Sequence, residues 1–134
     1  MKKKVNKIFV YGTLEKTEFF SDLISSGEIR YVGNGKIRAK LYDLVEYPGA
    51  VEHKRSYVYG RVYEIHNMDK VLPLLDEYEE FYPDKPEDSL FIRKVMRVIM
   101  ENGENLRAFV YIYNRSVDRM KVISTGIWLK DSSL

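Results

Sequence analysis

The stretch IFVYGTLEK, residues 8–16, passes from a run of β-forming residues straight into a glycine and a small hydroxyl residue. The β-branched and aromatic side chains at 8–11 favour a buried strand. Beyond that strand, the backbone N–H groups of Gly12, Thr13 and Leu14 have no ladder partner, and Gly12 has no side chain to block a ligand. Successive free amides form a nest for a carboxylate or an oxyanion. The sequence leaves open a plainer alternative, a strand-to-helix turn in which Thr13 caps the next helix.

The bulk composition is typical of one globular domain spanning residues 1–134. Its hydrophobic residues make up 45% and its charged residues 31% of the 134 positions, which is ordinary for such a domain. The absence of cysteine excludes disulfides and cysteine-based metal sites, and it fits a cytoplasmic location. No apolar run is long enough for a membrane-spanning helix or a signal-peptide core, so we expect neither.

The charge balance argues against several classes of partner. The formal net charge is only +2, so we expect no nucleic-acid partner, and this balance counts against the alternative of a basic, tyrosine-rich face that binds single strands. His53 and His66 have no second ligand at metal-binding spacing, so we expect no metal and no cofactor. The eleven tyrosines favour β structure and also suit a polar pocket for a small molecule.

Alternating or β-rich patterns predict five strands. They are residues 7–11, 36–44, 56–65, 90–100 and 105–113. Asn102-Gly103 predicts the turn of a hairpin between the last two strands, because both residues accept positive φ. Gly60 in the middle of the third strand indicates a bulge or a close backbone approach. Turns are predicted at 33–36 and at 47–50, the latter a type II turn around Pro-Gly.

Two helices complete the prediction. Helical spacing of apolar residues favours a short helix within 15–26 and a second helix within 68–81, with Asn67 as its cap. Pro73 lacks a backbone donor, so the regular part of the second helix is expected to begin near residues 70–72. Long antiparallel strands with few helices predict an α+β fold, a small, mainly antiparallel β-barrel of about five or six strands with two flanking helices.

The acidic segment LDEYEE, residues 75–80, is the second candidate for chemistry. Asp76 and Glu79 are three residues apart, so they share a helix face near the apolar stripe, whereas Glu77 and Glu80 point further round. Burial at the edge of an apolar stripe raises the pKa of a carboxyl group and makes it a candidate general base near neutral pH. A solvated acidic face at the helix end is the alternative that the sequence leaves open.

The two motifs together resemble the gamma-glutamylcyclotransferase-like family. The resemblance rests on VYGTL at 10–14 followed some sixty residues later by LDEYE at 75–79. LYDL at 41–44 with YPGAV at 47–51, and YGRVYE at 59–64, are similar to further strands of that family. It implies a small β-barrel with flanking helices and substrates that are γ-glutamyl compounds, released as 5-oxoproline and a free amine or amino acid.

The resemblance also implies roles for individual residues. Tyr11, Gly12, Thr13 and Leu14 would hold the substrate, and Glu79 would be the catalytic general acid/base. The sequence departs from the family pattern at Glu80, where glycine is usual, and at Phe91, where tyrosine is frequent. These departures leave open a non-catalytic module that binds a small carboxylate on the same fold. The sequence does not predict the leaving amine or the oligomeric state.

Overall fold

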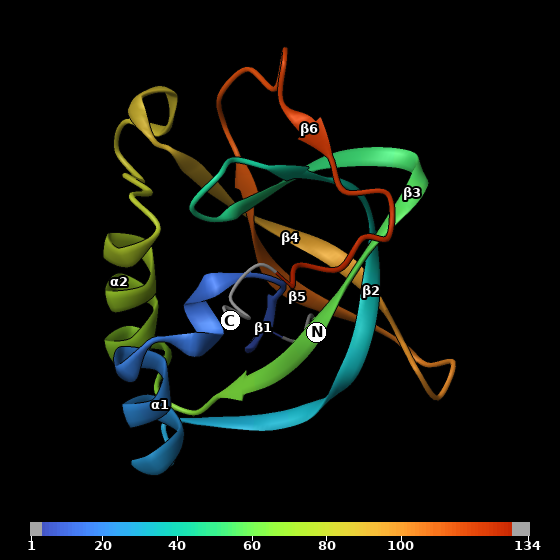
Figure 1. Cartoon of the computed structure of the whole chain (residues 1–134). Helices are drawn as coiled ribbons and strands as arrows, with labels where there is room; N and C mark the ends of the chain where they lie inside the picture. The colour runs from blue at the N-terminus through green and yellow to red at the C-terminus, as the bar shows by residue number, and fades with distance from the viewer. Residues whose placement is uncertain (1–3, 130–134) are drawn as a thin grey trace.

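A computed structural model of the chain describes residues 4–129, which form six strands, two α-helices and two 3₁₀ turns (Figure 1). The strands are β1 (Lys7–Val10), β2 (Ile29–Asp43), β3 (Pro48–Ile65), β4 (Phe91–Met100), β5 (Asn105–Tyr113) and β6 (Lys121–Val122). The helical segments are η1 (Thr13–Lys16), α1 (Glu18–Ser25), α2 (Met68–Tyr78) and η2 (Pro86–Asp88).

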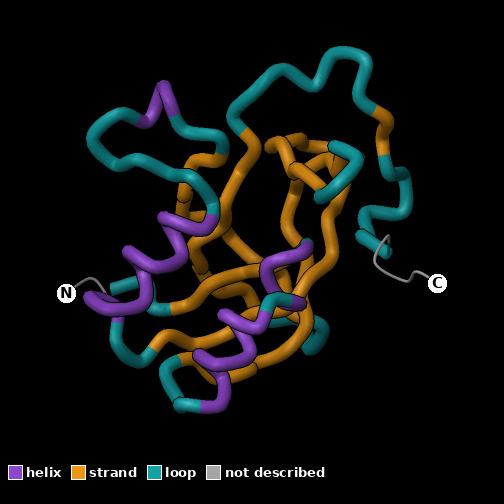
Figure 2. Tube along the Cα trace, turned by 60° about the vertical axis from the view of Figure 1, so that its left-hand side comes forward, coloured by secondary structure: helices purple, strands orange, loops and turns teal. Residues whose placement is uncertain are grey.

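The sheet closes on itself to form a barrel. Its strand order is β3-β1-β5-β4-β2-β6, and an additional pairing between β2 and β3 joins the two sides. β1 and β5 run parallel, whereas the other pairs are antiparallel. The short β6 extends the sheet beyond the closed part. Figures 1 and 2 show both α-helices against the same side of the barrel. The predicted α+β fold, a mixed and mainly antiparallel barrel with two flanking helices, is confirmed.

Strand β1 separates two hydrophobic clusters. Side chains alternate between the two faces of a strand, so Phe9 packs into the barrel interior while Ile8 and Val10 pack toward the helices. All three are nearly inaccessible to solvent. A strand that is buried on both faces needs a continuous apolar run rather than an alternating one, which explains the sequence of residues 8–11.

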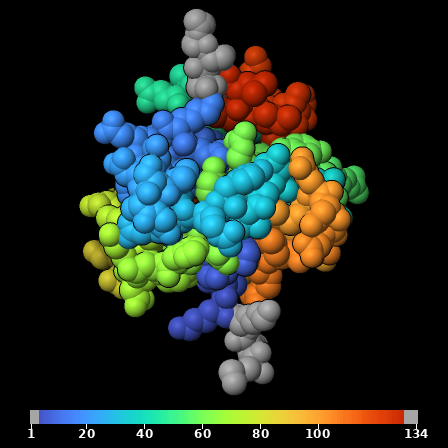
Figure 3. Space-filling model, turned by 90° about the horizontal axis from the view of Figure 1, so that it is seen from below, coloured from blue at the N-terminus to red at the C-terminus, as the bar shows by residue number. Residues whose placement is uncertain are grey.

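The two helices cover one wall of the barrel. α1 buries Phe20 and Leu23 and lies beside β2, with the β4–β5 hairpin on the far side of β2 in Figure 3. Its cap is Thr17, whose hydroxyl accepts a hydrogen bond from the Phe20 amide at 3.0 Å, so the alternative cap at Thr13 is wrong. No helix in the range 4–129 is long and apolar enough to cross a membrane.

Helix α2 begins earlier than predicted. It starts at Met68 and contains Pro73 within its regular part, so the expected start near residues 70–72 is wrong. Asn67 occupies the cap position as predicted, but its side chain makes no capping hydrogen bond. Burial of Val71 and Leu75 against the barrel stabilises the helix despite the missing proline donor, because tertiary packing outweighs local propensity.

The turn predicted at residues 33–36 is wrong, because this segment lies inside β2. Gly35 pairs with Gly60 of β3 on one side and with Met100 of β4 on the other. A Cβ atom on Gly35 would lie 2.6 Å from Cγ1 of Val98. The glycine therefore allows three strands to approach closely where the barrel closes, and the chain does not reverse there.

The turn predicted at residues 47–50 is displaced. The reversal lies just before it, where the Leu44 amide donates to the Tyr47 carbonyl at 3.0 Å and Val45 has a φ of +83°. Pro48 is the first residue of β3, a position at which a strand tolerates the missing donor. This shift brings Tyr47 and Pro48 to the end of the barrel beside the Tyr11–Leu14 segment.

Two predictions about glycine are confirmed. Gly103 has a φ of +91° in the turn between β4 and β5, as expected for the Asn-Gly hairpin. Gly60 marks a close backbone approach, because a Cβ atom there would lie 2.2 Å from the carbonyl oxygen of Val10 in β1.

Candidate active site

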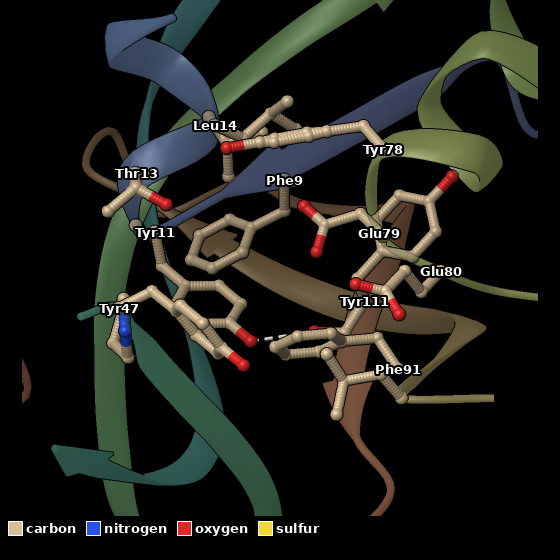
Figure 4. A pocket seen from close by; sticks show the side chains of 14 residues that line it. Phe9, Tyr11, Thr13, Leu14, Tyr47, Tyr78, Glu79, Glu80, Phe91 and Tyr111 are labelled. Carbon is tan, nitrogen blue, oxygen red and sulfur yellow. Dashed lines mark hydrogen bonds between the residues drawn. The ribbon is translucent and has the colours of Figure 1, made fainter. Parts of the chain in front are cut away.

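A cavity of about 240 Å³ lies at the end of β1, between the barrel and the C-terminal end of α2. The volume suits an amino-acid-sized ligand, since pockets for larger molecules measure about 300–1,000 Å³. Its walls are mainly apolar and aromatic (Figure 4). The lining residues are Phe9, Val10, Tyr11, Gly12, Thr13, Leu14, Tyr47, Pro48, Tyr78, Glu79, Glu80, Leu90, Phe91 and Tyr111. The five residues predicted for the site, Tyr11 to Leu14 and Glu79, are all among them.

The Tyr11–Leu14 segment forms one wall of the cavity. Gly12 has a φ of −141°, so a positive φ is not the reason for glycine here. A Cβ atom on Gly12 would lie 2.7 Å from Cγ of Pro48, so the glycine is required by the close approach of the β2–β3 turn. Packing against Pro48 therefore explains why a glycine follows the first strand.

The amides that follow the strand remain available. In a 3₁₀ helix each N–H bonds to the carbonyl three residues before it, so the first N–H groups of η1, those of Thr13 and Leu14, have no partner within it. Among the described residues, the amides of Gly12, Thr13 and Leu14 donate to no group outside η1. The three residues line the cavity, and backbone amides of such a segment are able to bind an anionic oxygen.

Glu79 faces this segment across the cavity. It is the C-cap residue of α2, directly after Tyr78, and it is half-buried. Figure 4 shows its carboxylate pointing from the α2 side into the space between Phe9 and Thr13. Burial, and secondarily the charge of Glu80, raises the pKa of Glu79 to about 7. A carboxyl group with this pKa exchanges protons readily near neutral pH.

Glu80 was expected to point away from this face, and the structure corrects that expectation. It has a φ of +56° and follows Glu79, the C-cap residue of α2. The Phe81 amide donates to the Asp76 carbonyl at 2.9 Å and the Glu80 amide to the Glu77 carbonyl at 3.2 Å, which together form a Schellman motif. The left-handed turn reverses the chain direction and places Glu80 in the cavity wall.

Asp76 shares the inward face of α2 with Glu79, as its three-residue spacing predicts, but it has structural partners. The Arg93 guanidinium donates to both carboxylate oxygens of Asp76, at 2.7 and 2.6 Å. The Tyr111 hydroxyl donates to the same carboxylate at 2.6 Å. These bonds connect α2 to β4 and β5. Asp76 therefore fixes the helix on the barrel one turn before Glu79.

Tyr11 lines the cavity with its ring, while its hydroxyl joins parts of the barrel. The hydroxyl donates to the Tyr111 carbonyl at 2.7 Å and accepts from the Ala50 amide at 3.1 Å. Burial, and secondarily the charge of Glu79, raises the pKa of the Tyr11 hydroxyl. The hydroxyl thus stays protonated, and only one acceptor lone pair is left for a ligand.

Most of the aromatic lining was missed in the sequence. Tyr47 was assigned only to a turn, and Tyr111 only to a strand, although both contribute to the cavity wall. No local pattern marks these residues, because they reach the cavity through barrel closure. Burial also raises the pKa of the Tyr47 hydroxyl. Phe91 is buried in the wall, so the cavity has a phenyl ring at the position where the resembled family frequently has a tyrosine.

The described part of the chain contains no cluster of side chains that could bind a metal ion. No group of three or more histidine, cysteine, aspartate or glutamate side chains in residues 4–129 is placed to hold a metal ion. The polar groups of the residues that line the cavity are the carboxyl groups of Glu79 and Glu80, the Thr13 and tyrosine hydroxyls, and backbone groups.

Comparison with known sequences gives two findings. The family model described as gamma-glutamyl cyclotransferase, AIG2-like, matches residues 8–130. The gamma-glutamylcyclotransferase family protein YtfP of Escherichia coli K12 is 31% identical over 124 residues, which cover 92% of this chain and 96% of YtfP. The residues matched by the family model include the Tyr11–Leu14 segment and the end of α2.

Comparison with solved structures gives the same barrel. An AIG2-like protein from mouse (Mus musculus) has a TM-score of 0.70 at 21% identity, with 95% of this chain and 90% of that chain covered. The solution structure of YtfP from E. coli has a TM-score of 0.65 at 30% identity, with coverages of 95% and 99%. The architecture is thus common to proteins that share only a fifth to a third of their residues.

Proposed function

Since this chain belongs to the gamma-glutamyl cyclotransferase, AIG2-like family, we propose that it converts a γ-glutamyl amine or γ-glutamyl amino acid to 5-oxoproline and a free amine. In enzyme terms it is an amine-releasing acyltransferase or lyase. The proposal assigns the acid/base role to Glu79 and the substrate-holding role to Tyr11, Gly12, Thr13 and Leu14. No cofactor takes part in the proposed reaction.

One observation carries the proposal. A half-buried carboxyl group with a pKa of about 7 and a segment with unused amides line the same small cavity. Glu79 supplies the proton acceptor, and the amides supply donors for an oxygen that becomes negatively charged. An intramolecular acyl transfer from an amide requires these two elements.

The mechanism follows from the positions of these groups. The α-carboxylate or γ-carbonyl oxygen of the substrate lies against the amides of Gly12, Thr13 and Leu14. Glu79 removes a proton from the α-ammonium group, and the resulting amine attacks the γ-carbonyl carbon of the same molecule. The new carbon–nitrogen bond closes a five-membered ring. The amide bond then breaks, and Glu79 returns its proton to the departing nitrogen. The ring nitrogen releases its second proton, which the freed amine takes up, so 5-oxoproline and an ammonium ion form and no water is consumed.

Orientation and oxyanion binding contribute comparable amounts. Holding the nucleophile and the carbonyl of one molecule in reactive geometry contributes up to about 7–11 kcal/mol to lowering the barrier. Each well-placed oxyanion donor adds about 3–4 kcal/mol, so two or three donors match the contribution of orientation. The cavity therefore acts both by folding the glutamyl chain and by binding the oxygen that becomes negatively charged.

The proposal is tested with a panel of γ-glutamyl dipeptides and γ-glutamyl amines, with 5-oxoproline detected by mass spectrometry. We expect the wild-type protein to release 5-oxoproline and the Glu79→Gln variant to release none while it stays folded by circular dichroism. Unchanged turnover in Glu79→Gln would refute the assignment.

The alternative is a non-catalytic module that binds a small carboxylate in the same cavity. It is favoured by Phe91, which places no hydroxyl at a position where a tyrosine is frequent. A thermal-shift titration with the same compounds separates the two functions. Stabilisation of the fold by ligands, together with no 5-oxoproline from any of them, would support the binding module.

A further inference from the structure

We propose that Glu80 selects the leaving group, so that this chain prefers γ-glutamyl conjugates of an alkyl diamine over conjugates of an amino acid. The released amine would then carry a second positive charge and no carboxylate. This inference rests on the proposed cyclotransferase function. It assigns a specificity-determining role to a residue that departs from the glycine usual in the resembled family.

The turn after α2 determines where the Glu80 side chain lies. Glu80 is the left-handed residue of the Schellman motif, with a φ of +56°. At this position the backbone leaves the helix, and the side chain no longer follows the helical phase that it would share with Glu77. As a result Glu79 and Glu80, although adjacent, both line the cavity. In Figure 4 the Glu80 carboxylate lies beside Phe91, further from Thr13 than the Glu79 carboxylate.

The cavity wall has negative charge with no compensating cation. Among its fourteen lining residues are two glutamates and no lysine, arginine or histidine. The charges of Glu80, Glu46 and Glu79 all act on the Tyr47 hydroxyl, where they add to burial in raising its pKa. The guanidinium of Arg93, on neighbouring β4, donates both of its short hydrogen bonds to Asp76.

The size of the cavity determines which half of the substrate lies inside it. A cavity of about 240 Å³ is filled by the glutamyl part, which has to reach both Glu79 and the amides of Gly12 to Leu14. The group beyond the scissile amide then extends toward the mouth, where Tyr78 and Glu80 are exposed. A leaving group with an ammonium end is attracted to the Glu80 carboxylate, and one with a carboxylate end is repelled by it.

The backbone conformation of Glu80 indicates that its carboxylate has a role. A residue with a side chain is strained at positive φ, whereas glycine is not. Nothing in the hydrogen-bonding pattern of the turn requires the Glu80 side chain, since both bonds of the motif are made by backbone groups. This chain nevertheless carries a carboxylate there, in the wall of the cavity.

The test compares three γ-glutamyl amides of similar length. Their amines are 1,4-diaminobutane, pentylamine and 4-aminobutanoate, so the far end is positive, neutral or negative. Each kcat/KM is measured from 5-oxoproline release at about pH 8.5, where Glu79 is ionised in every variant. We expect kcat/KM to decrease from the positive to the neutral to the negative amide, with about a fivefold preference for positive over neutral, the size typical of a partly exposed charge pair.

Two variants test whether Glu80 causes the preference for the positive amide. Glu80→Gln is expected to abolish the preference. The matched control Glu77→Gln makes the same change in net charge at an exposed side chain outside the cavity lining, and it should keep the preference. Raising the salt concentration from about 0.05 to 1 M should weaken the wild-type preference, because it screens exposed charges.

The results distinguish a failure of this inference from a failure of the proposed function. Equal kcat/KM for the three amides in the wild-type protein would overturn the inference and leave the proposed function standing. A preference that persists in Glu80→Gln, or that is lost equally in Glu77→Gln, would overturn the role of Glu80. Absence of 5-oxoproline from all three amides would overturn the proposed function, and this inference with it.

Discussion

Replacing Asp76 with asparagine tests whether the ion pair behind the cavity holds α2 on the barrel. The side chains of Asp76 and Arg93 are 11% and 22% exposed and lie 2.6 Å apart. Asparagine keeps the shape of aspartate and still accepts the Tyr111 hydrogen bond, but it leaves the Arg93 charge without its partner. The change therefore removes one charge from a largely buried pair and little else.

The magnitude follows from the burial of the pair. Removing one partner of a buried ion pair costs about 3–5 kcal/mol. Because Arg93 is partly exposed and able to turn toward water, we expect a smaller cost for Asp76→Asn, about 2–3 kcal/mol. Tyr111→Phe, which removes a hydrogen bond to a charged group but leaves the ion pair, should cost about 1.5–3 kcal/mol.

The assay is equilibrium unfolding in urea followed by circular dichroism. With a slope of about 1–3 kcal/mol per molar urea, a loss of about 2–3 kcal/mol lowers the midpoint by about 0.7–3 M. Glu77→Gln, an exposed acid of the same helix, is the control and should stay within about 0.5 kcal/mol of the wild type. An Asp76→Asn protein as stable as this control would show that the pair does not hold the helix.

Three further predictions concern single residues. Between about pH 5 and pH 8 the unfolding free energy of the wild-type protein should decrease relative to that of Glu79→Gln. The folded-state pKa of Glu79 is raised from 4.5 to about 7, so the folded state retains a proton that the unfolded state releases. Urea-derived unfolding free energies that change equally with pH in the two proteins would contradict this. Glu80→Gly should raise the unfolding free energy by about 1 kcal/mol by relieving the positive φ, whereas Glu80→Gln should not, and thermal melts of both variants would show the difference. Gly60→Ala should prevent normal folding, because its Cβ would meet the Val10 carbonyl at 2.2 Å; a variant with wild-type unfolding free energy would refute this close approach.

Local patterns predicted those parts of the fold that local physics decides. The hairpin around Gly103 follows from a dipeptide that accepts positive φ, and the buried strand at residues 8–11 follows from a continuous apolar run. The two predicted turns failed for a different reason. Gly35 and Pro48 have the composition of turns, yet Gly35 is needed where three strands meet, and Pro48 begins a strand beside Gly12. Contacts between distant segments, which a single sequence does not display, decided both positions.

The candidate site likewise has features that the sequence predicts and features that only the tertiary structure decides. The sequence alone determined that an acid and a strand-ending glycine loop were present, and the i, i+3 spacing of Asp76 and Glu79 determined that both face one side of the helix. Only the tertiary structure decided that Asp76 pairs with Arg93 while Glu79 remains in the cavity, and that a left-handed backbone brings Glu80 back to its wall. The physical reason is that helix periodicity fixes direction within one element, whereas partners and burial depend on how separate elements close around a shared space.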